Sequence, residues 1–220
     1  MKAASNSMPW PPIDDLMSDL SLANGITLRL LCEEDLPTLP GQLLEWYPAV
    51  RVGSESVFLS QEFLHRAVVR QGNLAPDIYA FFLVQDNAVV GFMSFERQPA
   101  NGTLHARLGV LAPSARTGFL GALGFLAFER LGTRCGAELL LAWITLASRN
   151  QQMFAERRGF RLVGVVPGFD RDQVHESKSL RVAEALVAKL LVGTDELLEP
   201  LPENLTPRTL RLLETVRKSS

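Results

Sequence analysis

The sequence feature that most constrains the fold is a β-hairpin pattern in the middle of the chain. Residues 78–85 are rich in aromatic and β-branched side chains, Asp86-Asn87 follows, and residues 88–95 resume the strand pattern. A short polar pair between two such runs predicts a tight turn. After a second turn, residues 103–111 continue the same pattern. Three antiparallel strands in succession are therefore predicted here.

The flanking segments alternate between helix and strand patterns. The expected elements are a strand over 26–31, helices to about 46 and over 60–70, the three strands, a helix over 119–131, a strand over 138–145, a helix over 150–158 and a strand over 160–166. Residues 180–192 are ambiguous, because the Ala-Glu-Ala-Leu stretch favours a helix whereas the order of elements favours a last strand. Residues 138–145 are almost uniformly apolar, which predicts burial on both faces. This order predicts an α+β fold with a mixed sheet of six to seven strands, antiparallel then parallel, flanked by helices.

The two ends of the chain differ in pattern from the middle. Prolines near the N-terminus prevent helix formation there, so residues 1–25 are predicted to be a mobile leader with at most a short helix over 14–22. The domain itself is expected over 26–192. Thr206-Pro207 suits a helix start, and residues 193–220 are predicted to form a C-terminal helical extension.

Composition excludes several functional classes. The 220 residues are 47% hydrophobic and 21% charged, with a net charge of −2, which disfavours nucleic-acid binding. No apolar stretch approaches the ~20 residues that a membrane helix needs, and no export signal is seen, so a cytoplasmic protein is expected. Cys32 and Cys135 are the only cysteines and lie in no metal-binding pattern. We therefore expect no metal.

Four local sequences, taken in this order of elements, resemble a known family. They are residues 26–37, 86–92, 109–122 and 150–160. Together they resemble the GNAT superfamily of acyl-CoA-dependent N-acyltransferases, and residues 127–132 are similar to the branch that acetylates ribosomal-protein N-termini. The resemblance implies transfer of an acetyl or short acyl group from acyl-CoA to a primary amine, by direct attack in a ternary complex and without a metal. A small-molecule amine, a protein N-terminus or a lysine would be the acceptor.

The resemblance also implies a coenzyme site where residues 109–122 pass from strand to helix. The family signature is Arg/Gln-x-x-Gly-x-Gly/Ala, whose backbone N–H groups bind the pyrophosphate at a helix N-terminus. Phe119 stands at the middle glycine position and is expected to point into the core. Leu111 would polarise the thioester carbonyl through its N–H, and Asn150 would place the pantetheine or simply cap its helix. The implied coenzyme-binding residues are Leu111, Arg116, Thr117, Gly118, Phe119, Leu120, Gly121, Ala122 and Asn150.

Acid–base chemistry is assigned by position in the family pattern. His105 lies eleven residues before Arg116, where many members carry a glutamate, and is the first candidate for the general base; the alternative is a strand residue without a chemical role. Glu96 is the second, with a solvated edge carboxylate as the alternative. Strict alternation would place His105, Arg107 and Gly109 on one side of their strand and Leu104, Ala106 and Leu108 on the apolar side.

Other positions bear on the leaving group and the acceptor. Ala155 and Met153 occupy the positions of the tyrosine and serine that serve as acid in family members. Trp46 and Tyr47 fall in the acceptor-selecting region, as pocket walls or as packing residues. The alternatives to an enzyme are a catalytically silent GNAT-fold module that binds acyl-CoA or a protein partner, and an oligomeric scaffold. The oligomeric state stays open, a homodimer included.

Overall fold

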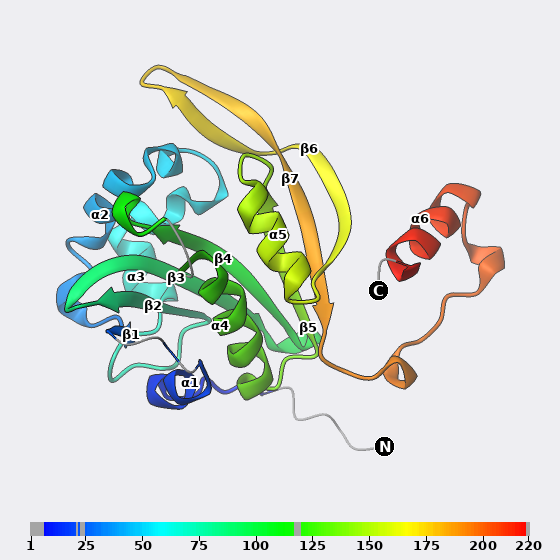
Figure 1. The fold of residues 1–220 in the computed structure, drawn as a ribbon, viewed down its shortest axis with the longest axis horizontal. Coiled ribbons are helices and arrows are strands. Elements are labelled where there is room, and N and C mark those ends of the chain that lie inside the picture. Colours follow the sequence, from blue (N-terminus) through cyan, green and yellow to red (C-terminus); the bar gives the residue numbers. More distant parts are fainter. Residues whose placement is uncertain (1–6, 21, 23–24, 117–119, 219–220) are drawn as a thin grey trace.

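The computed structural model describes residues 7–20, 22, 25–116 and 120–218, and shows a mixed sheet with helices on both faces (Figure 1). Seven strands form one sheet in the order β1-β2-β3-β4-β5-β7-β6. The strands are β1 (Ile26–Leu30), β2 (Ile78–Gln85), β3 (Ala88–Gln98), β4 (Thr103–Leu111), β5 (Leu139–Thr145), β6 (Arg161–His175) and β7 (Lys178–Leu190). The α+β class and the strand number predicted from the sequence are confirmed.

The helices occupy the connections between these strands. They are α1 (Ile13–Leu20), α2 (Leu39–Trp46), α3 (Gln61–Ala67), α4 (Leu120–Cys135), α5 (Arg149–Arg157) and α6 (Pro207–Lys218). Short 3-10 turns link several of them, of which η2 (Pro48–Arg51) and η3 (Ser54–Leu59) matter for the site. The Ser60 side chain accepts a hydrogen bond from the Phe63 N–H and caps α3, at the start of the helix expected over 60–70.

Strands β1 to β4 form an antiparallel meander. Asp86 and Asn87 make the β2–β3 turn with φ angles of 50° and 66°, a conformation that these two residue types tolerate. The β4–β5 pair is the one parallel contact of the described sheet, and β7 enters antiparallel between β5 and β6. The parallel part of the sheet is therefore confined to one pair, because β6 and β7 form a hairpin.

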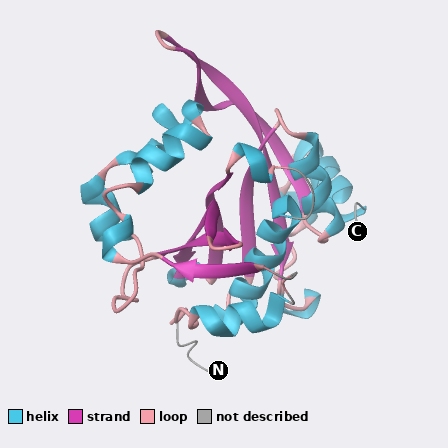
Figure 2. Cartoon of the chain, turned by 60° about the vertical axis from the view of Figure 1, so that its left-hand side comes forward, coloured by secondary structure: helices cyan, strands magenta, loops and turns pink. Residues whose placement is uncertain are grey.

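Aromatic packing identifies the two faces of the sheet. On one face Phe95 stacks on Phe128 of α4 with centroids 5.2 Å apart, and Phe128 stacks on Phe160 at 5.6 Å. On the other face Phe58 of η3 meets Phe92 edge-on at 5.7 Å. Helices α4 and α5 cover the first face, while α2, α3 and their 3-10 turns cover the second (Figures 1 and 2). We call them the α4 face and the η3 face.

A β-bulge in β4 interrupts the simple alternation predicted for that strand. Met93 pairs with Gly109, but Phe95 pairs with Ala106, so β4 holds one extra residue. Ser94 secures the bulge: its hydroxyl accepts from the Leu108 N–H at 3.1 Å and donates to the Leu108 carbonyl at 3.0 Å. Gly109 consequently lies opposite Met93, whose side chain reaches α4. The prediction that Gly109 shares a side with His105 was wrong.

Three further element predictions need correction. Strand β5 alternates between buried and half-buried residues rather than being buried on both sides. Helix α4 continues through Gly132, which packs closely on Leu140, and ends before Gly136 at φ 75°. Strand β6 does not stop at Pro167-Gly168, because a bulge between Val166 and Asp170 absorbs these residues while pairing with β7 resumes.

The described part of the N-terminal segment packs into the core, unlike the leader that the sequence predicted. Met8, Trp10, Leu16 and Leu20 are all buried. The Trp10 indole donates to the Pro76 carbonyl at 2.8 Å, and its ring lies 5.1 Å from that of Tyr79. The apolar side chains that flank the prolines therefore anchor this segment, a role that the local pattern alone does not reveal.

The C-terminal extension leaves the domain after β7. Two 3-10 turns, η6 (Thr194–Glu196) and η7 (Pro202–Asn204), interrupt an otherwise irregular connection. Helix α6 then lies beside β6 at the margin of the domain, as Figure 1 shows. Leu198 is 97% exposed in the connection, so this segment contributes little to the core.

The packing of α1 leads to a stability prediction. Leu16→Ala should lower the free energy of unfolding by about 2–5 kcal/mol, since Leu16 is fully buried between α1 and the core. Urea denaturation would measure the change. The exposed neighbour Ser18→Ala is the matched control and should shift the midpoint little. A Leu16→Ala variant as stable as the parent would show that the N-terminal segment is detached.

Candidate active site

Strands β4 and β5 pair over only part of their lengths. The ladder joins Thr103–Ala106 to Leu139–Ala142 and ends there, although β4 continues to Leu111 and β5 to Thr145. The bulge at Leu108 lies where the pairing stops, and a bulged strand bends away from its partner. The backbone of both strands beyond Ala106 and Ala142 is therefore free of the ladder that joins them earlier. An extended chain could pair at this opening.

Helix α4 begins close to the end of β4. Its first described residues are Leu120, which is buried, and Gly121, where an added Cβ would approach the Phe154 ring of α5 to 2.9 Å. A larger residue at this position would therefore require the Phe154 ring to shift. Thr117, Gly118 and Phe119 lie outside the described residues, so the predicted inward orientation of Phe119 stays a prediction.

Arg116 ties the end of β4 to the end of α2. Its Nε donates to the Leu111 carbonyl at 3.3 Å, and its Nη2 donates to the Trp46 carbonyl. Trp46 itself is 6% exposed and belongs to the core, which matches the packing alternative for this residue. The guanidinium thus joins the two segments beside the opening in addition to any part in coenzyme binding.

The N-cap of α5 is Ser148 rather than Asn150. The Ser148 hydroxyl accepts from the Gln151 N–H at 3.4 Å, which removes the capping alternative for Asn150. Asn150 is exposed in the first turn of the helix. Ala155 is buried, and Met153 is half-buried. Neither side chain carries a proton donor.

His105 and Glu96 face each other across the β3–β4 ladder on the η3 face. The Glu96 carboxylate accepts a hydrogen bond from Arg107 Nη1, and Arg107 Nε donates to Glu55 Oε1 at 3.0 Å. Burial lowers the pKa of His105; the Glu96 charge opposes this shift, and the Arg107 charge adds to it. Burial raises the pKa of Glu55, because it disfavours the charged carboxylate, and the Arg107 charge opposes that shift. One guanidinium thus holds two carboxylates on this face.

Strand β6 is attached to the segment after α2 by two further carboxylates. The Tyr47 hydroxyl donates to Asp172 Oδ1 at 2.9 Å, and burial with this hydrogen bond raises the pKa of Tyr47. Asp170 accepts from the Ser54 N–H at 2.9 Å and from its hydroxyl at 2.8 Å. Tyr47 therefore lies on the η3 face, where its hydroxyl positions β6.

Glu184 joins this group, although sequence reasoning did not single it out. It lies on β7 opposite Thr145, the last residue of β5. Burial raises its pKa to about 7, and the nearby charges of Asp170, Asp172 and Glu55 add to the effect. The signal in the sequence was a single acid within the apolar run 182–188, which helix propensity obscured.

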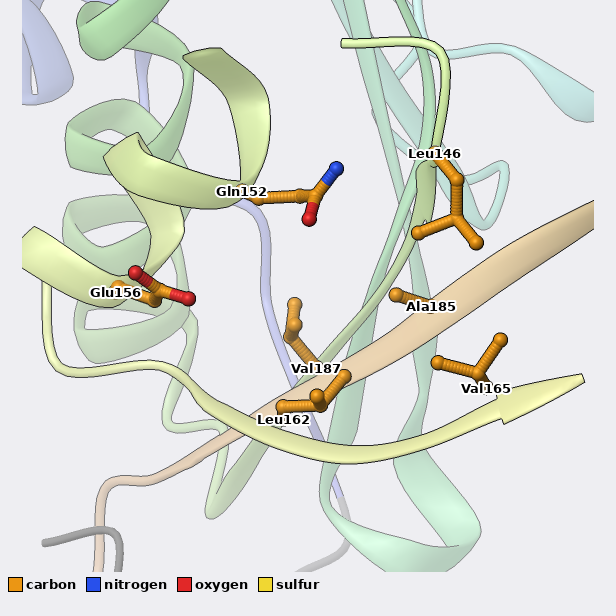
Figure 3. A pocket seen from close by; sticks show the side chains of 7 residues that line it. All are labelled: Leu146, Gln152, Glu156, Leu162, Val165, Ala185 and Val187. Carbon is orange, nitrogen blue, oxygen red and sulfur yellow. The ribbon is translucent and has the colours of Figure 1, made fainter. Parts of the chain in front are cut away.

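Two hollows accompany the hairpin of β6 and β7. One, of about 70 Å³, lies between α5 and the hairpin on the α4 face, as Figure 3 shows, with Gln152 and Val165 among its walls. The other, of about 290 Å³, lies between η2 and the tip of the hairpin, where the residues that follow Asp172 line it. Its lining includes Arg51, Gln173 and His175. Only the second is large enough for a small organic molecule.

The described residues contain no group of three or more His, Cys, Asp or Glu side chains that could hold a metal ion. Within the same part of the chain, no helix combines the length and the apolar character needed to cross a membrane.

Comparison with solved structures decides the fold. A ribosomal-protein α-N-acetyltransferase in complex with coenzyme A superposes with a TM-score of 0.60 at 16% identity, over 78% of this chain and 97% of that one. This chain has the GNAT fold. A protein described as a GNAT-family acetyltransferase from Desulfovibrio desulfuricans gives a TM-score of 0.56 at 15% identity, over 76% and 99% of the two chains.

A dodecameric spermidine N-acetyltransferase from Vibrio cholerae shares the GNAT fold with this chain as well. The TM-score is 0.58 at 14% identity, over 76% of this chain and 95% of that one. No family model and no curated protein matches the sequence. The similarity is therefore one of fold, and the chemistry must be argued from the residues.

The raised pKa of Glu184 predicts how stability depends on pH. Between about pH 4.5 and 7 the unfolded chain loses this proton while the folded chain keeps it, so the free energy of unfolding falls as pH rises through that range. Glu184→Gln should remove this fall in the free energy of unfolding. At pH 8 the variant should be more stable than the parent by about 1 kcal/mol, allowing for solvent screening of a half-exposed group.

Urea denaturation between pH 4 and pH 8 would check this expectation. The two proteins should converge near pH 4, where both side chains are neutral. Glu203→Gln, at an exposed carboxylate of the C-terminal extension, should leave the pH dependence unchanged. Parallel curves for Glu184→Gln and the parent would show that Glu184 ionises normally.

Proposed function

We propose that the protein transfers an acetyl group from acetyl-CoA to a primary amine. The observation that carries this proposal is the opening between β4 and β5, which starts after Ala106 and Ala142 and leads to the start of α4. An extended pantetheine arm can pair with strand backbone that lacks a ladder partner, and a helix N-terminus suits a pyrophosphate. The GNAT fold and a structural neighbour in complex with coenzyme A support the same assignment.

The donor would bind from the α4 face. Backbone N–H groups in the first turn of α4, from Leu120 to Ala122, would hold the pyrophosphate together with the preceding loop. The Leu111 N–H at the end of β4 would donate to the thioester oxygen and stabilise the charge that develops there. Arg116 would keep the loop in place through its bonds to Leu111 and Trp46. Asn150 is exposed at the start of α5 and would contact the pantetheine.

The acceptor would approach from the η3 face. Five carboxylates gather there, from Glu55, Glu96, Asp170, Asp172 and Glu184, and Arg107 is the cation paired directly with two of them. A negative surface potential attracts an ammonium group and raises its local concentration. A small amine, a lysine or a protein N-terminus would satisfy this requirement. Structural neighbours are described as acting on both a ribosomal protein and spermidine.

The leaving group needs no side-chain acid in this scheme. Ala155 and Met153 offer no proton donor at the positions where the family carries one. The thiol of coenzyme A resembles that of cysteine, with a pKa of about 8.5, so water can protonate the thiolate.

A direct assay would test the proposed activity. Thiol release from acetyl-CoA is followed with spermidine, lysine and a peptide with a free N-terminus, while a thermal shift measures coenzyme binding. Amine-dependent thiol release is the expected result, and stabilisation by coenzyme A should accompany it. Stabilisation without turnover would favour a silent acyl-CoA-binding module. Neither response would favour the scaffold alternative.

The placement of Gly121 gives a sharper test of the donor site. Gly121→Glu should abolish coenzyme A binding, since a carboxylate would stand in the first turn of α4, where the pyrophosphate is expected. Any side chain at this position also pushes on Phe154. Gly121→Gln has the same shape without the charge and is the matched control.

Calorimetry of coenzyme A binding, with a thermal melt to verify folding, would distinguish the two effects. The glutamine variant should bind more weakly than the parent, and the glutamate variant should bind far more weakly still. Equal affinities of the two folded variants would mean that the anion does not bind at this helix.

A further inference from the structure

Glu184 lies beside the part of the sheet where β4 and β5 separate. It pairs with Thr145, three residues beyond Ala142, at which the β4–β5 ladder ends. Its neighbours on β7, Ala185 and Val187, line the hollow beneath α5 on the α4 face, as Figure 3 shows. Successive side chains of a strand point to opposite faces. The Glu184 side chain therefore points to the η3 face, from which the acceptor would come.

The other two candidates for the base are less well placed. His105 pairs with Leu141, within the closed part of the β4–β5 ladder and before the opening. The Glu96 carboxylate is engaged in an ion pair with Arg107, which occupies the side that faces the acceptor region. Glu184 has neither restriction: it lies at the level of the opening and, among the described residues, forms no ion pair.

Titratable side chains from three other parts of the chain surround Glu184. Asp170 and Asp172 approach from β6, Glu55 from η3, and the Tyr47 hydroxyl from the end of α2. Asp170 and Asp172 are occupied by Ser54 and Tyr47, and Glu55 by Arg107, which is the cation of this group. These contacts hold three carboxylates in place, and burial together with the charges of these carboxylates raises the pKa of the fourth, Glu184.

We propose that Glu184 is the general base that removes a proton from the ammonium form of the acceptor. The inference rests on the proposed acetyl transfer and identifies the residue that makes the amine nucleophilic. A carboxylate whose pKa is raised to about 7 is close to the operating pH, where a base is most effective. An ordinary glutamate, at about 4.3, would accept a proton from an ammonium group much less readily.

The step balances in protons and electrons. The ammonium gives one proton to the Glu184 carboxylate, and the freed lone pair of the nitrogen attacks the thioester carbon to form the C–N bond. Collapse of the tetrahedral intermediate breaks the C–S bond, and its electron pair leaves on sulfur. The second proton of the nitrogen reaches the thiolate through water. The products are the amide and free thiol, and Glu184 returns its proton to solvent.

The test compares steady-state kinetics of three variants with the parent. Glu184→Gln should lower kcat by roughly 10²–10⁴-fold with little change in the KM for acetyl-CoA. Glu184→Asp keeps the carboxylate and should recover part of the rate. His105→Gln should retain the acidic limb of the pH profile, which is the rise in rate with pH below neutrality, because His105 is not the base. Glu203→Gln, far along the C-terminal extension, should match the parent.

The pH profile gives a readout that a structural role would not change. The rate of the parent should rise with pH through an apparent pKa near 7, and Glu184→Gln should lose this limb. The experiment is repeated with two amines of different basicity. If the rise in rate reports deprotonation of the amine, its apparent pKa shifts with the basicity of the amine. If the rise reports deprotonation of the enzyme, its apparent pKa stays the same.

The outcomes also separate this inference from the proposed function. A parent that binds no coenzyme A and releases no thiol overturns the function itself. A parent that turns over normally, with Glu184→Gln equally active or with its acidic limb intact, overturns only the assignment of Glu184. Loss of that limb in His105→Gln instead would assign the base to His105.

Discussion

The short parallel contact between β4 and β5 is the constraint on which the arrangement of the site depends. Four residues of each strand pair, and the bulge held by Ser94 and Leu108 then turns β4 away. Because hydrogen bonding to β3 continues on the other side, the strand keeps its place in the sheet while its β5 side opens. In the proposed function, the opening would join the donor at the start of α4 to the acceptor beside the carboxylates of the η3 face.

Electrostatics on the η3 face is the second determinant. Glu55, Glu96, Asp170, Asp172 and Glu184 come from four elements, and Arg107, Ser54 and Tyr47 bind four of them. Bringing carboxylates together in a half-buried place costs free energy, because each disfavours the ionisation of the next. Ion pairs and hydrogen bonds hold four of these carboxylates in place, while burial and the neighbouring charges raise the pKa of Glu184 to about 7. Such a group is suited to exchanging protons near neutral pH.

Packing at the ends of the chain shows how far local pattern can mislead. The N-terminal prolines indicate a segment without regular structure, yet Trp10 and Leu16 are buried in the core and the Tyr79 hydroxyl donates to the Pro11 carbonyl at 3.0 Å. Irregular backbone is no obstacle to burial once its polar groups find partners. Likewise, β6 passes Pro167 and Gly168 because pairing with β7 resumes on the far side of the bulge. Contacts between distant residues overrode the local sequence signal in both places.

The sequence by itself determined the element order, the β2–β3 turn at Asp86-Asn87 and the start of α3 at Ser60, because these depend on periodicity and on conformations that few residue types adopt. It also led to the GNAT fold, whereas the coenzyme loop within residues 109–122 stays a prediction. Only the tertiary structure decided which side chains meet. A single bulge reversed the side on which Gly109 lies, and the β6–β7 hairpin brought Asp170 and Asp172 to Tyr47 and Ser54, more than 100 residues earlier in the chain. The raised pKa of Glu184 follows from burial and from those distant neighbours, so the single acid in the apolar run 182–188 marked the position but not its proton affinity.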